Sequence, residues 1–153
     1  MKLTILNTRE VKKIRQLLEQ NFGSFLKEDY AYLRNQKNRV FIVNKDLAKI
    51  DLRGLRIDRI GLYFGEIKPN QFRLSKEGAA LLVKESKKVN NVITLSNVEI
   101  QEYFKGDDIK KDLGEDSKLV ILEYQGNIIG CASYKEKTIL NFLAKIHRGT
   151  VIV

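Results

Sequence analysis

The sequence has no tryptophan, one proline, one cysteine (Cys131) and one histidine (His147) among its 153 residues. A single cysteine excludes an internal disulfide and suits a reducing compartment, so we expect the protein in the cytoplasm. A single histidine excludes a metal site built from two or more histidines. No apolar run approaches the length of a membrane span and no signal-peptide pattern opens the chain, so we expect no membrane association.

The residues that enzymes use for catalysis are also scarce. Neither phosphate-loop pattern, G-x-x-x-x-G-K-[ST] nor G-x-G-x-x-G, occurs, so no nucleotide cofactor is expected. Asp107-Asp108 and Glu115-Asp116 are adjacent pairs whose side chains would point to opposite faces of a strand, which makes each pair a poor cation site. Cys131 follows Gly130 in an apolar strand and is expected to be a buried structural thiol. We therefore expect no catalytic residue, no metal and no cofactor.

Positive charge is abundant and unevenly distributed. Lysine and arginine number 28 against 19 aspartates and glutamates, a net charge of +9. Residues 1–87 hold 19 of these cations and 10 of the anions, whereas residues 88–153 hold nine of each. Such a surplus favours a polyanionic partner, RNA above all, over the alternative of an ordinary charged surface. Within the neutral part, residues 131–153 carry Lys135, Lys137, Lys145 and Arg148 against Glu136 alone, which leaves room for a basic stripe near the C-terminus.

The first half of the chain has the pattern of a sheet with flanking helices. Apolar residues recur at helical spacing from Val11 to Phe22, after a cap at Asn7 or Thr8 and before Gly23. Residues 1–6 suggest an edge strand, and residues 30–33 and 40–43 a hairpin. Residues 60–67 and 72–74 form a second expected hairpin around Pro69-Asn70, and Ser75 then caps a helix. A short helix is expected over residues 45–50. The following arginines, which either contact phosphate or pair with local aspartates, are Arg53, Arg56 and Arg59.

The second half shows many short strands and one early helix, which is typical of a small barrel or pseudo-barrel. Asn97 is expected to cap that helix, which runs through Tyr103-Phe104 and ends at Gly106. Residues 119–124 and 127–133 form an expected hairpin around Gln125-Gly126, and residues 150–153 a last strand. The fold class is therefore α+β, with an N-terminal α/β domain over residues 1–86 and a β pseudo-barrel over residues 87–153.

Several blocks of sequence occur in the order seen in a known family. They are AYLRNQKNRVFIV, then LYFGEI and FRLSKEGAALL, then EIQEYFKGDDIKKDLG. Together they resemble the Nip-seven family, ribosome-assembly factors of archaea and eukaryotes. The resemblance implies an N-terminal domain with an antiparallel sheet and flanking helices, followed by a C-terminal PUA domain, a small RNA-binding pseudo-barrel.

The resemblance also implies where RNA binds. In PUA domains the loop after the helix and the closing strands border the nucleic-acid surface. Carried onto this sequence, that implies as RNA-binding residues Lys105, Gly106, Lys110, Lys111, Lys135, Lys137, Lys145, His147 and Arg148. Tyr134, between Ser133 and Lys135, is the aromatic residue expected to be exposed. No recognition-helix pattern appears, so single-stranded or looped RNA is the expected ligand.

The implied role is RNA binding in pre-rRNA processing and large ribosomal subunit assembly. Two alternatives stay open. The protein could be an adaptor that uses its N-terminal domain to bind assembly factors or a processing machine such as the exosome. It could also be a targeting subunit for an RNA-modifying enzyme, since PUA domains often accompany such enzymes.

Overall fold

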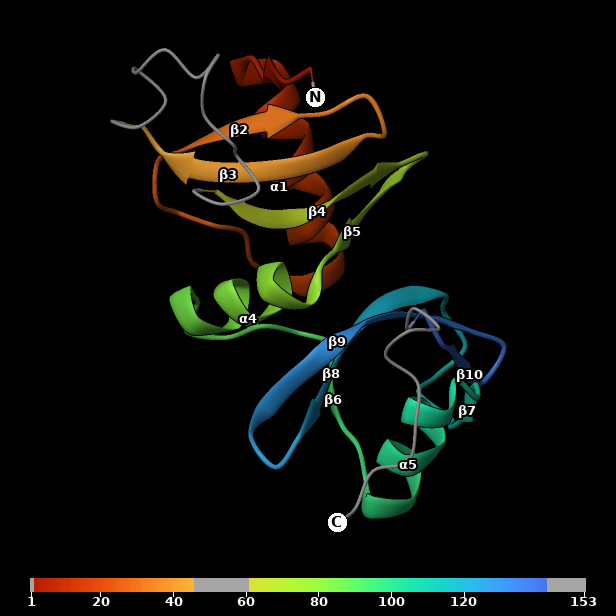
Figure 1. The fold of residues 1–153 in the computed structure, drawn as a ribbon. Coiled ribbons are helices and arrows are strands. Elements are labelled where there is room, and N and C mark those ends of the chain that lie inside the picture. Colours follow the sequence, from red (N-terminus) through yellow and green to blue (C-terminus); the bar gives the residue numbers. More distant parts are fainter. Residues whose placement is uncertain (1, 46–60, 143–153) are drawn as a thin grey trace. The chain divides into compact units, whose positions relative to one another are not determined.

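The computed structural model describes residues 2–45 and 61–142. The chain divides into two compact units, residues 1–90 and 91–153, each with its own sheet (Figure 1). The Asn90 N–H donates to the carbonyl of Phe22 at 2.7 Å, which attaches the polar segment before Asn91 to the first unit. The domain boundary expected between residues 86 and 87 falls inside that segment and stays a prediction.

The first unit contains a five-stranded antiparallel sheet whose strands follow one another in chain order. Its strands are β1 (Thr4–Ile5), β2 (Tyr30–Arg34), β3 (Arg39–Asn44), β4 (Leu62–Lys68) and β5 (Gln71–Leu74). Both expected hairpins are present, and the short N-terminal segment is the expected edge strand. Asn70 adopts a φ of 60° in the two-residue turn between β4 and β5, a conformation that asparagine tolerates better than most residues.

Two helices of this unit begin at residues that can cap them. Helix α1 (Thr8–Phe22) begins after Asn7, whose side chain accepts from the Glu10 N–H at 2.9 Å while the Glu10 carboxylate accepts from the Asn7 N–H at 3.1 Å. This reciprocal pair makes Asn7, and not Thr8, the cap. Helix α4 (Lys76–Glu85) begins after Ser75, as expected.

One part of the core of the first unit lies between these helices and one face of the sheet, and a separate buried cluster contains Leu33, Phe41 and Val43. Helix α1 buries Ile14, Leu18 and Phe22, while α4 packs on β4 and β5 (Figure 1). A Cβ atom placed on Gly78 would lie 2.0 Å from the carbonyl oxygen of Phe64, so only glycine allows α4 to pack this closely on β4. Phe64 itself is fully buried.

The second unit is a curled half-barrel that matches the expected pseudo-barrel. Its described strands have the order β6-β8-β9-β10-β7, and among them only β6 pairs in parallel, with β8. Its elements are β6 (Val92–Thr94), α5 (Asn97–Lys105), β7 (Ile109–Lys110), β8 (Lys118–Tyr124), β9 (Asn127–Lys135) and β10 (Thr138–Leu140). The α+β fold class is thereby confirmed.

Helix α5 covers the concave side of this sheet. Ser96, and not Asn97, caps it: the Ser96 hydroxyl accepts from the Glu99 N–H at 3.2 Å, and the Glu99 carboxylate accepts from the Ser96 N–H at 2.9 Å. The expected cap was wrong by one residue because serine and asparagine are both good caps and stand side by side. Gly106 ends the helix with a φ of 91°, as expected.

Tyr134 is buried, which contradicts the expectation that it is exposed. Its ring belongs to the core of the second unit and is 0% exposed. Its hydroxyl accepts from the Leu113 N–H at 2.8 Å and donates to the Gly114 carbonyl at 2.7 Å. The polar neighbours of Tyr134 in sequence suggested a surface position, but successive strand residues point to opposite faces, so those neighbours carry no such information.

Some expectations lie outside the described residues. They are the helix over residues 45–50, the row Arg53, Arg56 and Arg59, and the strand over residues 150–153.

Candidate nucleic-acid interface

Two of the predicted lysines lie in one row on the outer face of the second sheet. Thr138 of β10 pairs with Lys110 of β7 on one side and with Lys135 of β9 on the other. Residues paired across neighbouring strands share a face, so both lysine side chains lie on the face away from the core. The next row, Ile109–Ile139–Tyr134, is buried inside. We call Lys110, Thr138 and Lys135 the PUA outer row.

Lys137 lies in the tight turn next to this row. Glu136 and Lys137 form the two-residue connection between β9 and β10 and have φ values of 52° and 58°. The Lys137 ammonium lies 3.9 Å from the Asp112 carboxylate, with side chains 59% and 68% exposed. An ion pair so exposed contributes little, so it leaves Lys137 able to contact a polyanion.

Lys111 is separated from the other lysines. Its side chain is on the face opposite to that of Lys110, and its ammonium contacts both carboxylate oxygens of Glu99 at 3.1 Å. Burial alone would raise the pKa of Glu99, but the backbone hydrogen bond from Ser96 and the Lys111 ammonium hold it below its ordinary value. Lys111 therefore holds α5 against β7, which makes it the weakest RNA-contact candidate among the described lysines.

Lys105 and Gly106 adjoin the segment that follows β10. The Asn141 side-chain amide donates to the carbonyl oxygens of Tyr103 and Asp107 at 2.7 and 3.0 Å. These hydrogen bonds connect the loop after α5 to the segment that follows β10. Lys105, the last residue of α5, is exposed next to that loop. The remaining predicted residues, Lys145, His147 and Arg148, lie outside the described residues and stay predictions.

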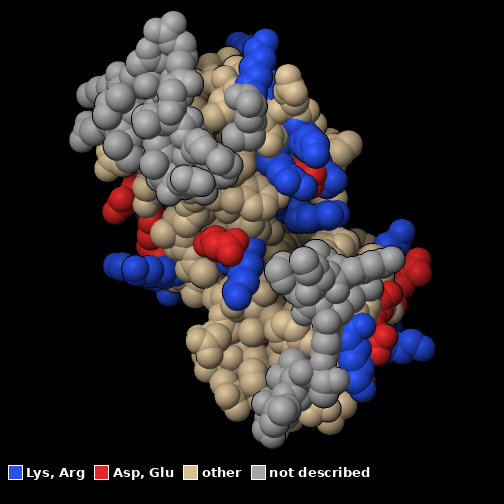
Figure 2. Space-filling view, in the orientation of Figure 1, with Lys and Arg blue, Asp and Glu red and all other residues tan. Residues whose placement is uncertain are grey.

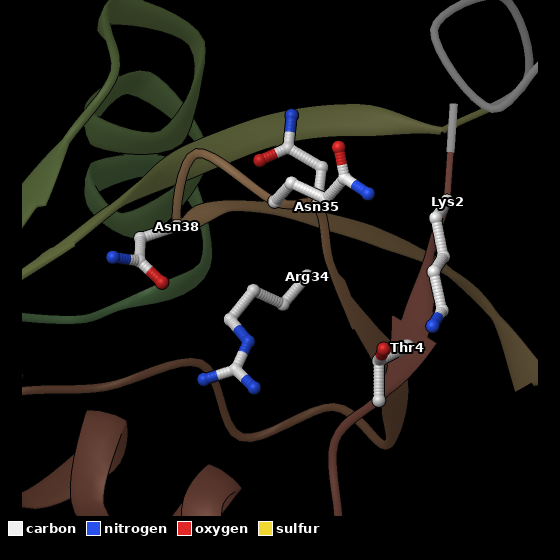
Figure 3. A pocket seen from close by; sticks show the side chains of 6 residues that line it. Lys2, Thr4, Arg34, Asn35 and Asn38 are labelled. Carbon is white, nitrogen blue, oxygen red and sulfur yellow. The ribbon is translucent and has the colours of Figure 1, made fainter.

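The first unit contains a pocket that the sequence did not indicate. It has a volume of about 310 Å³ and lies beside β1 and the turn between β2 and β3 (Figure 3). It is lined by Lys2, Thr4, Arg34, Asn35, Gln36 and Asn38. The connection 35–38 was interpreted only as a hairpin turn. The signal that could have drawn attention to it was the surplus of cations before residue 88.

Three of the lining residues show how the pocket is built. In Figure 3 the side chains of Lys2 and Thr4 come from the edge of the sheet and that of Arg34 from β2. The Arg34 guanidinium lies 3.9 Å from the Glu10 carboxylate of α1, and both side chains are more than one-third exposed, so the pair is weak. The cationic and amide side chains that line this polar pocket are of the types that bind anions.

The described residues contain neither a metal-binding cluster nor a membrane-spanning helix. Within residues 2–45 and 61–142, no group of three or more His, Cys, Asp or Glu side chains could hold a metal ion. No helix in these ranges has the length and apolar character needed to cross a membrane. Cys131 is buried, as expected.

Comparison with known families bears on both units. Residues 4–75 match the pre-PUA domain of NIP7/UPF0113 proteins, and residues 90–148 match the PUA domain described for the methyltransferase RsmF. The order of the two domains is that expected from the sequence blocks. The chain belongs to the Nip-seven family.

Membership of the Nip-seven family assigns the candidate RNA-binding lysines and the pocket to different domains. The PUA outer row and the loop after α5 lie in the PUA domain, a type of domain that binds RNA. The pocket lies in the pre-PUA domain. The two domains support an RNA-binding protein of the ribosome-biogenesis type. The Nip-seven family is a family of non-catalytic factors. No curated protein matches the chain significantly.

Proposed function

We propose that this Nip-seven protein binds single-stranded or looped rRNA during pre-rRNA processing and large ribosomal subunit assembly, in the cytoplasm and without catalysing a reaction. The observation that carries the proposal is the PUA outer row beside the exposed Lys137, in a domain of an RNA-binding class. Lysine side chains on an exposed sheet face neutralise phosphates without reading bases.

The remaining predicted RNA-binding residues come from two other parts of the second unit's sequence. Lys105 and Gly106 border the segment after β10, and Lys145, His147 and Arg148 follow later in the same segment of the sequence. We propose that these residues and the PUA outer row contact one RNA strand, and that Lys111 acts on it only indirectly through α5.

The experiment is cross-linking of the tagged full-length protein to RNA in cells, followed by sequencing of the attached RNA. Enrichment of large-subunit rRNA precursors over mature rRNA and messenger RNA supports the proposed role. Enrichment of unrelated RNA would reject the ribosomal part, and no enrichment over an untagged strain would reject RNA binding in the cell.

The adaptor function is the second candidate, favoured by the separate pre-PUA domain. Purification of the tagged protein with and without ribonuclease distinguishes the adaptor function from RNA binding as the main role. Assembly factors, exosome subunits or a modifying enzyme that remain bound after ribonuclease treatment would favour the adaptor. Loss of all partners would favour RNA binding as the main role.

A further inference from the structure

The pocket beside β1 has one wall that strand pairing builds at the edge of the first sheet. Thr4 of β1 pairs with Arg34 of β2, so their side chains lie on the same face of the sheet. The Arg34 guanidinium lies 3.9 Å from the Glu10 carboxylate of α1, which identifies this face as the one that α1 covers. In Figure 3 the Lys2 side chain extends towards that of Thr4. This wall therefore presents an ammonium, a guanidinium and a hydroxyl.

A second wall is the turn between β2 and β3, which hydrogen bonds hold in one conformation. The Asn35 side-chain oxygen accepts from the N–H groups of Lys37 and Arg39 at 2.9 and 3.0 Å. Asn38 has a φ of 62°, and its carbonyl accepts from the Ile67 N–H of β4 at 2.9 Å. A wall that is ordered before binding loses little conformational freedom when a ligand enters.

The side-chain amides of Gln36 and Asn38 are available to a ligand. Both side chains are exposed and line the pocket, and neither has a hydrogen-bond partner within residues 2–45 and 61–142. The exposed Lys2 ammonium has no ion-pair partner in the same ranges. An amide both donates and accepts hydrogen bonds, whereas ammonium and guanidinium groups only donate. The pocket thus combines charge for an anion with groups that can recognise a polar edge.

The charges around the pocket favour an anionic ligand. Lys2 and Arg34 line it and no acidic residue does, while Lys37 lies exposed in the adjoining turn. Glu10 is the carboxylate that contacts Arg34, and because both side chains are more than one-third exposed, their pair is weak. Figure 2 shows Lys and Arg side chains gathered at the end of the sheet where the turn between β2 and β3 lies. Such a gathering attracts anions.

The volume and the donor set fit a nucleotide. The volume of about 310 Å³ lies at the lower end of the range for ligand sites, which is about 300–1,000 Å³, and exceeds what a lone phosphate ion fills. Cationic side chains bind phosphate oxygens, and a glutamine or asparagine amide pairs with adenine through one donor and one acceptor. A carboxylate ligand would use the cations but leave the amides unmatched.

We propose that this pocket binds one nucleotide of a single-stranded RNA, with Lys2, Thr4 and Arg34 around the phosphate and Gln36 and Asn38 at the edge of the base. The proposal rests on RNA binding as the proposed function and adds a base-contacting site in the pre-PUA domain. Contacts to phosphate position an RNA strand, whereas contacts to base edges select its sequence. The pocket would therefore give the protein a preference for adenine.

The test is an NMR titration of the ¹⁵N-labelled full-length protein with adenosine 5′-monophosphate (AMP), and separately with adenosine and with inorganic phosphate. We expect the side-chain amide signals of Gln36 and Asn38 to shift with AMP. AMP should bind about tenfold more tightly than either adenosine or phosphate, because only AMP engages both walls. A single-stranded oligoadenylate RNA should shift the same signals and displace AMP.

Charge variants test the phosphate contacts. Lys2→Gln/Arg34→Gln is expected to weaken AMP binding about tenfold relative to the matched control Lys87→Gln/Lys88→Gln, which removes two exposed lysines after α4. Glu10→Gln keeps the capping hydrogen bond but removes the charge beside Arg34, so it should strengthen AMP binding about two- to threefold.

An amide variant tests the base contact. Gln36→Ala should weaken AMP binding and leave the binding of inorganic phosphate unchanged, because phosphate does not reach the base site. Gln20→Ala, which removes an exposed amide from α1, is the matched control and should change neither. Thermal unfolding of each variant verifies that it is folded.

Three results would overturn the nucleotide site. They are equal AMP affinities in each variant and its control, inorganic phosphate that binds as tightly as AMP, and AMP that stays bound when oligoadenylate saturates the protein. The proposed function stands in each case if Lys110→Gln/Lys135→Gln weakens RNA binding. A wild-type protein that binds no RNA would reject both the nucleotide site and the proposed function.

Discussion

At the scale of single residues, neighbouring side chains of the same type have different roles. Lys110 and Lys111 are adjacent, yet Lys110 lies on the outer face and Lys111 contacts both carboxylate oxygens of Glu99. The alternation of a strand separates them. The family resemblance implied both lysines as RNA contacts, and nothing in the sequence shows which one faces Glu99.

Tyr134 provides a prediction at this scale. Tyr134→Phe removes a hydroxyl that accepts from the Leu113 N–H and donates to the Gly114 carbonyl, and it leaves the part-buried Leu113 N–H without this partner. We expect the free energy of unfolding of the second unit to fall by about 1–3 kcal/mol. Urea titration followed by circular dichroism measures the change.

RNA affinity at low urea should stay at the wild-type value, because the hydroxyl is buried. Tyr124→Phe, whose hydroxyl makes an exposed hydrogen bond to Asn97, is the control and should cost less. If Tyr134→Phe instead weakened RNA binding and left the stability unchanged, Tyr134 would be an RNA-contact residue.

Glu99 provides a second prediction, on pH. Its pKa in the folded protein is below the ordinary value of 4.5, so its charge contributes stability that is present above pH 4.5 and is lost as the pH falls through the folded-state pKa. Glu99→Gln preserves the capping geometry, because glutamine suits the same position, but removes the charge. We expect wild type to unfold at a higher temperature than this variant at pH 7, with the gap closing below pH 4.5.

Thermal unfolding from pH 3 to pH 7 measures that gap. The exposed Glu115→Gln is the control and should show a small gap at every pH. A gap for Glu99→Gln that persists unchanged at pH 3 would contradict the role assigned to its charge.

At the scale of elements, local chemistry fixed much of the fold. The cap Ser75, the terminating Gly106 and the turn at Pro69-Asn70 were predicted correctly, since each acts within a few residues of itself. Asn7 was one of two candidate caps for α1, and the sequence did not decide between Asn7 and Thr8. Lys110 and Lys135 were each predicted as RNA contacts, but the row that they form with Thr138 was not predicted. This row depends on the register between three strands, and on which face each strand buries.

The close packing of α4 on β4 provides a prediction at the scale of elements. In an exposed helix, a change of Gly to Ala stabilises by about 1 kcal/mol. Gly78→Ala should do the opposite, because the new methyl group would lie 2.0 Å from the Phe64 carbonyl oxygen and force α4 away from β4. We expect a loss of about 1–3 kcal/mol or more in the first unit, measured by urea unfolding. A more stable variant would show that α4 does not pack on β4 in this way.

At the scale of the whole molecule, both the distribution of charge along the sequence and the positions of the cations on the described surface favour a polyanionic partner. Residues 88–153 have no net charge, yet the PUA outer row presents lysines on one face of the sheet and Lys137 lies exposed in the turn next to it. Residues 1–87 carry the whole surplus of positive charge, and two of their cations, Lys2 and Arg34, line the pocket beside β1. The sequence alone placed RNA binding in the PUA domain and left the surplus of the first unit unexplained.

The central claim is that this Nip-seven protein acts by presenting these cations to RNA. Its most direct test is the salt dependence of RNA binding by the full-length protein, compared among double variants that each remove two positive charges. The variants are Lys110→Gln/Lys135→Gln, Lys145→Gln/Arg148→Gln and the control Lys12→Gln/Lys13→Gln. We expect the first two to lower the slope of log K against log salt by about 1.4 relative to the control. Slopes and affinities equal to those of the control in both variants would contradict the claim.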